Sequence, residues 1–158
     1  MTRQGAEAAI AHAESLPAFA SLRDAESALY QLRDKRRAAL DQIAAVSDIA
    51  LDYSADSLKT LEKSYFTLCE TDGFNKIAVT REQFEHLMGI YSGWVYTENN
   101  ESFQWIVEES HWIPGRYSIA VSNGFLTRVI GPVNHLHKLT NNKRMQSMYR
   151  EYKQYSST

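Results

Sequence analysis

Apolar residues recur at three- and four-residue steps through the first hundred positions, a spacing that predicts a run of amphipathic helices. Pro17 must end the first helix, because proline cannot continue the backbone hydrogen-bond ladder. Thr80 and Gln83 have the spacing of a capping box, which predicts that a helix begins there. The predicted helices cover residues 4–15, 22–46, about 54–72 and 80 to about 95.

The helix predicted at residues 22–46 has a narrow apolar stripe and a charged opposite face. Such a stripe fits packing against one neighbouring helix, or pairing with a second copy of the chain as a coiled-coil homodimer. Fewer than four clean heptads are present, so both arrangements stay open. The stripe consists of Leu22, Ala25, Leu29, Leu32, Arg36, Leu40, Ile43 and Val46.

Two glycines four residues apart, Gly89 and Gly93, lie on one face of the helix that begins at residue 80. Each costs the helix about 1 kcal/mol relative to alanine. We therefore expect another part of the backbone to approach this face closely.

After Asn100 the apolar period changes to two, the period of a strand. Gly131 and Pro132 end this pattern, and two C-terminal helices are expected beyond them, at residues 133–139 and 143–155. The fold class is therefore α+β: N-terminal helices, a small antiparallel meander of three strands, and C-terminal helices. The strands are predicted at residues 103–108, 117–122 and 125–130, with turns at 114–115 and 123–124.

A length of 158 residues suits a single domain, in which a helical region (1–50) precedes an α+β core (51–158). No stretch approaches the roughly 18 apolar residues that a membrane-spanning helix needs. Glu7 and Glu14 interrupt the apolar core that a signal peptide would require. The expected compartment is the cytoplasm, with no membrane association.

Nothing in the sequence has the pattern of a nucleophilic or phosphate-binding site. Ser92 lacks a Gly-x-Ser-x-Gly frame, and no phosphate-binding glycine loop occurs. Glu108 and Glu109 are adjacent on a predicted strand, so their carboxylates point to opposite faces and cannot act together on one atom. The expectation is a non-enzymatic protein without catalytic residues.

Metal and thiol chemistry are not indicated either. His135 and His137 diverge on a helix, and Glu82 with His86 lacks a second pair of ligands. Cys69, the single cysteine, lies on a helical stripe and is predicted to be buried and inert. No metal or cofactor is expected.

Charge is distributed unevenly along a chain whose net charge is −2. Residues 51–110 carry four Lys and Arg against eleven Asp and Glu, whereas residues 111–158 carry seven against one. The basic tail mixes cations with tyrosines, as nucleic-acid-binding surfaces do, but it also fits an amphipathic terminal helix. Nucleic-acid binding is the less favoured alternative, because the whole chain is acidic.

Between residues 96 and 112 large aromatic side chains alternate with glutamates. Protein interfaces use aromatic residues at their centre and charge to steer association. This stretch is the predicted partner-binding surface, and Trp112, next to the turn at 114–115, is the tryptophan expected to be most exposed. Its members are Tyr96, Glu98, Glu101, Trp105, Glu108, Glu109 and Trp112.

Residues 51–155 also resemble a group of small bacterial α+β domains, several of them similar to immunity proteins encoded beside polymorphic or contact-dependent toxins. Trp94 stands where these domains often have a glutamate after Tyr-x-Gly. The resemblance implies a non-enzymatic inhibitor that occludes the active site of a cognate toxin. The matching segments are LDYSADSLKTLEKSY, HLMGIYSGWVY, FQWIVEES, RYSIAVSNG, VIGPVNHLHKL and SMYREY.

Overall fold

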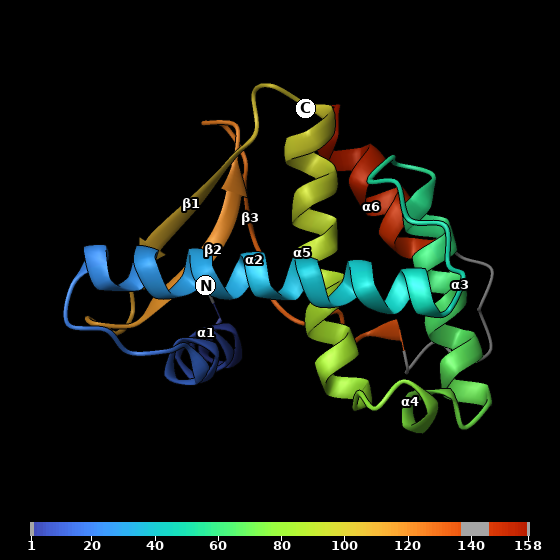
Figure 1. The fold of residues 1–158 in the computed structure, drawn as a ribbon. Helices are drawn as coiled ribbons and strands as arrows, with labels where there is room; N and C mark the ends of the chain where they lie inside the picture. The colour runs from blue at the N-terminus through green and yellow to red at the C-terminus, as the bar shows by residue number, and fades with distance from the viewer. Residues whose placement is uncertain (1, 137–145, 158) are drawn as a thin grey trace.

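The computed structural model describes residues 2–136 and 146–157 and confirms the α+β class (Figure 1). Within these residues a three-stranded antiparallel sheet in the order β1-β2-β3 is combined with six helices. The elements are α1 (Arg3–Ser15), α2 (Leu22–Val46), α3 (Ser57–Glu70), α4 (Gly73–Lys76), α5 (Arg81–Asn99), β1 (Gln104–Glu109), β2 (Tyr117–Ser122), β3 (Thr127–Val129) and α6 (Ser147–Ser156).

Hydroxyl side chains begin three of the helices. The Ser21 side chain accepts a hydrogen bond from the backbone N–H of Asp24 at the start of α2, and Thr2 does the same for α1. The capping box predicted at Thr80 and Gln83 is present at α5, with both reciprocal bonds formed. These caps satisfy backbone groups that the first helical turn leaves unpaired.

The sheet has an inner face, which packs on helices, and an outer face. Val121 lies in the larger apolar core with residues of α2, α3, α5 and α6. Ile119 lies in a smaller apolar cluster with Ala25 and Leu29 of α2. Since side chains alternate along a strand, these two residues define the inner face. Figure 1 shows α2 crossing the sheet and α5, with α3 and α6 on the opposite side of α5 from the sheet.

Helix α2 joins the N-terminal region to both apolar clusters, although its predicted stripe was only partly right. Leu29 and Leu40 are buried, whereas Leu22, Leu32 and Val46 are exposed. The buried side of α2 differs from the predicted stripe because α2 contacts two neighbours, α5 and the sheet, rather than a single helix along its whole length.

Cys69 is exposed, so the prediction of a buried thiol was wrong. It lies in the last turn of α3, one turn beyond the buried Tyr65. Its surroundings nevertheless raise the pKa of the thiol, first by desolvation, and do not favour the reactive thiolate.

The helix predicted at residues 133–139 does not form over 131–134, where the chain has no regular secondary structure. The backbone N–H of Val133 donates instead to the carbonyl of Glu85, 3.0 Å away, which ties this segment to α5. Residues 137–139 and 143–145 of the two predicted C-terminal helices lie outside the described residues, and α6 forms the described part of the second.

The two helical glycines differ in what they contact. A Cβ at Gly89 would collide with the backbone carbonyl of Gly131, so the predicted close approach of another backbone is confirmed there. A Cβ at Gly93 would collide with the ring of Trp105. At Gly93 the neighbour is therefore a side chain, and the prediction of a backbone contact was wrong.

Candidate functional site

The seven residues predicted to bind a partner do not gather in one patch. They follow the chain from the last turns of α5, along β1, to the turn that joins β1 and β2. A strand rises about 3.3 Å per residue, so the six residues of β1 separate its two ends by roughly 20 Å. The seven residues are therefore spread along the sheet rather than gathered at one point.

Tyr96 belongs to the core rather than to a surface. Its side chain is 3% exposed and packs against the rings of Phe103 and Tyr152, with centroids 5.0 and 4.9 Å away. Its place on the inner side of α5 follows from the helical stripe that it shares with the buried residues of that helix. It is therefore not available as a direct partner contact.

Two of the four predicted glutamates are used inside the molecule. Glu98 accepts a hydrogen bond from Arg37 of α2 at 2.9 Å. Glu109 accepts one from the backbone N–H of Gly115 at 2.7 Å, and so holds the β1–β2 turn. Glu101 and Glu108 form no ion pair with another described residue, and they are the predicted acids free to meet a partner.

Trp112 is 48% exposed, whereas Trp94 and Trp105 are half-buried, so the prediction that Trp112 is the most exposed tryptophan is confirmed. Sequence reasoning missed Phe125, which is 98% exposed in the turn between β2 and β3. The dipeptide Asn123-Gly124 could have indicated this exposure, because it predicts a tight hairpin turn, and the residue after such a turn lies at the solvent-exposed end of the next strand.

The outer sheet face lies between these two turns. Ile106 pairs with Ala120, and Ala120 pairs with Val129, so an apolar row crosses all three strands. Val129 is 47% exposed and Ile106 is half-buried, whereas Ala120 between them is 0% exposed. Helices α2 and α5, the described helices that pack on the sheet, do so on the inner face. The residues of this outer sheet face are Gln104, Ile106, Glu108, Ser118, Ala120, Ser122, Thr127 and Val129.

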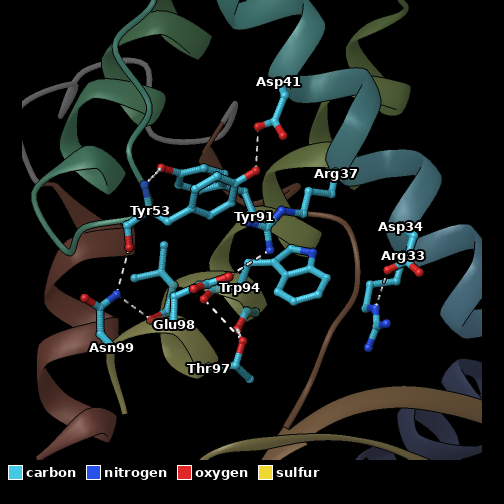
Figure 2. A network of polar contacts seen from close by, with 12 residues as sticks. Arg33, Asp34, Arg37, Asp41, Tyr53, Tyr91, Trp94, Thr97, Glu98 and Asn99 are labelled. Atoms are coloured by element: carbon cyan, nitrogen blue, oxygen red, sulfur yellow. Dashed lines mark hydrogen bonds and ion pairs between the residues drawn. The ribbon is translucent and has the colours of Figure 1, made fainter. Parts of the chain in front are cut away.

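A second feature, the arginine–aromatic cluster (Arg33, Arg37, Tyr53, Trp94 and Trp105), lies where α2 crosses α5 and β1 (Figure 2). The guanidinium of Arg37 lies 4.2 Å from the ring centre of Tyr53 and 4.3 Å from that of Trp94. That of Arg33 lies 4.8 Å from Trp94 and 5.3 Å from Trp105. Cations stacked on aromatic faces gain electrostatic attraction as well as contact area.

The loop before α3 completes this cluster. Tyr53 has a positive φ of 63° and stacks on Tyr91 at 4.7 Å. Its hydroxyl donates to Asp41 at 2.5 Å, as Figure 2 shows. Burial and that hydrogen bond raise the pKa of Tyr53 well above its ordinary value. Since both arginines are largely covered by their aromatic partners, we interpret the arginine–aromatic cluster as a joint that fixes α2 on α5 and β1.

Ser147 is the described serine nearest to an arrangement of catalytic type, and its geometry does not fit one. Its hydroxyl donates to buried Glu62 at 2.8 Å, and His135 lies 3.4 Å from the same oxygen. In a serine nucleophile the histidine must bridge serine and carboxylate, whereas here the serine lies between the other two. Glu62 also accepts from the Ser147 backbone N–H at 3.1 Å, so it serves as the cap of α6.

Among residues 2–136 and 146–157, no group of three or more His, Cys, Asp and Glu side chains is arranged to hold a metal ion. His137 lies outside these residues. The helices of the same described residues include none that is long and apolar enough to span a membrane.

The basic tail is partly described. Met148 and Tyr152 of α6 are buried, while Arg150 and Lys153 are exposed, as the amphipathic alternative predicts. Lys138, Lys143 and Arg144 lie outside the described residues.

Comparison with curated proteins gives no match, and comparison with solved structures gives none either. Comparison with protein families does: residues 18–156 match the family described as "Uncharacterised protein YwmA". The match begins just before α2 and ends in α6, so it covers the sheet and every described helix except α1. The chain therefore belongs to the YwmA family.

Proposed function

We propose that this chain is a non-enzymatic protein-binding domain and that its partner docks on the outer sheet face. The observation that carries the proposal is the accessible apolar side chains of Ile106 and Val129, which flank the buried Ala120 across three strands, with the other face of the sheet packed on helices. A flat apolar row with a polar rim is the usual composition of a protein interface. The exposed aromatic side chains of Trp112 and Phe125, in the two turns, extend the surface that a partner would cover.

The charge around this face favours a basic partner. Glu108 is the one ionisable residue of the outer sheet face, and Glu101 precedes β1 at the end of the sheet that also holds the β2–β3 turn. Complementary charge raises association rates and suppresses unsuitable partners. A protein with lysines or arginines around an apolar patch would therefore fit.

In its more specific form, the proposal is that the domain is a bacterial immunity protein, which neutralises a cognate toxin in the cytoplasm by covering its active site. A toxin that acts on nucleic acids or nucleotides has a basic active-site rim, which suits an acidic inhibitor surface. The support for this form is the resemblance of residues 51–155 together with the acidic groups Glu101 and Glu108.

The test begins with affinity purification of the tagged full chain from its native cells, with co-purifying proteins identified by mass spectrometry. The partner is then titrated against Val129→Lys and Glu108→Lys, which place positive charge on the outer sheet face. Each should weaken binding at least tenfold. Val46→Lys is the matched control, because Val46 is 79% exposed at the far end of α2, and it should bind as the unchanged chain does.

Two results would contradict the proposal: no protein partner in the purification, or a partner whose affinity is the same for all three variants. Circular dichroism and urea unfolding of each variant separate loss of binding from loss of fold. Inhibition of the partner's activity by the purified domain would then test the immunity form alone.

Pairing of two chains through α2 stays a prediction. Helix α2 still exposes Leu22, Leu32 and Val46 after packing on α5 and the sheet. A dimer detected by light scattering and lost in Leu32→Glu would support it.

A further inference from the structure

A groove of about 890 Å³ runs along α5 on the side where the chain returns from β3. The end of α1, the middle of α2, residues of β2 and β3, Glu151 of α6 and the segment at residues 130–135 form its other walls. His86 and Tyr96 both line the groove from α5. Ten helical residues rise about 15 Å, so the groove is elongated along that helix.

Arg36 of α2 lines the groove and has no counter-ion. It is half-buried and forms no ion pair or hydrogen bond with another described residue. Burial lowers the pKa of its guanidinium, and no neighbouring carboxylate offsets this. A partly desolvated guanidinium without an acid partner is unfavourable in the empty protein, and it presents five N–H donors to an anion that enters.

His86 lies on the facing wall. Burial lowers the pKa of its imidazole, the charge of Arg36 lowers it further, and Glu85 opposes the shift. At neutral pH the ring is therefore uncharged and can still donate one hydrogen bond. This end of the groove offers one full positive charge and one neutral donor.

Aliphatic side chains from α2, α5, β2 and the segment after β3 line part of the groove, together with polar residues such as Ser92 and Ser118. An apolar ligand body gains roughly 25 cal/mol for each Å² removed from water there. The aliphatic residues include Leu29, Leu32, Ile90, Ile119, Ile130 and Val133.

We propose that this groove binds an amphipathic monoanion: a carboxylate held by Arg36 and His86, with an aliphatic body along the apolar part of the walls. A medium-chain carboxylate has this chemistry. Arginine suits a carboxylate because its planar fork makes two parallel charge-assisted hydrogen bonds. The groove shares Ser118 and Val129 with the outer sheet face, so the test changes Arg36 instead, and its outcome is separate from that of the partner test.

The test is isothermal titration of the full chain with decanoate, butyrate and decanol. Decanoate, kept below its micelle concentration, should bind with one-to-one stoichiometry. Butyrate lacks the long aliphatic body and decanol lacks the carboxylate, so each should bind at least tenfold more weakly. Arg36→Gln should weaken decanoate at least tenfold, because the charge that holds the carboxylate is lost.

Arg23→Gln is the matched control, since Arg23 is exposed at the start of the same helix, and it should leave the affinity for decanoate unchanged. The proposal is overturned if decanoate does not bind, or if Arg36→Gln binds it as tightly as Arg23→Gln does. Retention on vesicles of anionic phospholipid without binding of monomeric decanoate would point to a lipid surface and also overturn it.

Discussion

Gly89→Ala tests the contact that joins α5 to the segment following β3. A Cβ at this position would lie far inside van der Waals contact of the Gly131 carbonyl oxygen and 3.0 Å from its carbonyl carbon. Both atoms belong to the backbone, so no side-chain rotation can relieve the collision. The two backbones must separate, and the hydrogen bond from Val133 to Glu85 stretches with them.

The expected magnitude combines three contributions. Alanine stabilises a helix by about 1 kcal/mol relative to glycine, which favours the variant. Overpacking costs about 1–3 kcal/mol, at the upper end where backbone must move, and a weakened hydrogen bond costs about 1 kcal/mol. We expect a net loss of about 3 kcal/mol in the free energy of unfolding, or roughly 6–12 °C in Tm for a chain of this length.

The assay is urea unfolding followed by circular dichroism, with Gly131→Ala as the matched control. A Cβ at Gly131 has no neighbour within 4 Å, and its φ is not in the left-handed region, so this variant should be as stable as the unchanged chain or slightly more so. If Gly89→Ala is no less stable than Gly131→Ala, α5 does not contact this segment as described.

Three further outcomes follow from titratable and polar groups. Arg36→Gln should raise the pKa of His86 toward its ordinary value in an NMR titration, and an unmoved pKa would refute the coupling between the two side chains. In the unchanged chain the pKa of His86 lies below 6.5, so the free energy of unfolding should fall as the pH drops from 6.5 through that pKa. Tyr65→Phe should cost about 1–3 kcal/mol in urea unfolding, because it leaves the buried carboxylate of Glu85 without a 2.7 Å hydrogen bond; a neutral effect would show that the bond is unimportant. Cys69 should react with a thiol reagent in the folded protein, and the reaction rate should increase as the pH rises toward the raised pKa of the thiol. Labelling only after unfolding would show that the Cys69 side chain is buried.

Local patterns along the chain were enough to predict most elements. The period of 3.6 located α2 at Leu22–Val46, and the capping box located the start of α5, because both depend on residues within one or two turns. The alternation after Asn100 located β1 and β2 for the same reason. The short helix α4 was not predicted, since four residues are too few to show a period.

Where local patterns failed, a distant neighbour was responsible. Pro132 and Val133 looked like the start of a helix, but the hydrogen bond to Glu85 holds this segment against α5. Cys69 shares a stripe with buried residues such as Tyr65, yet its own side chain is exposed. A helical stripe identifies the side that can be buried; the extent of burial depends on where the neighbouring elements end.

The predicted partner-binding residues and the groove show the same difference between what local patterns determine and what distant neighbours determine. The sequence determined that residues 96–112 combine aromatic and acidic side chains, and that adjacent strand residues such as Glu108 and Glu109 face opposite ways, because covalent geometry sets the period of a strand. It could not show that Tyr96 is buried, that Glu98 pairs with Arg37, or that Arg36 faces His86 across a groove. Those facts join residues roughly 50–60 positions apart or depend on burial, and they arise only when the packing of α2 on α5 brings the side chains together and removes them from water.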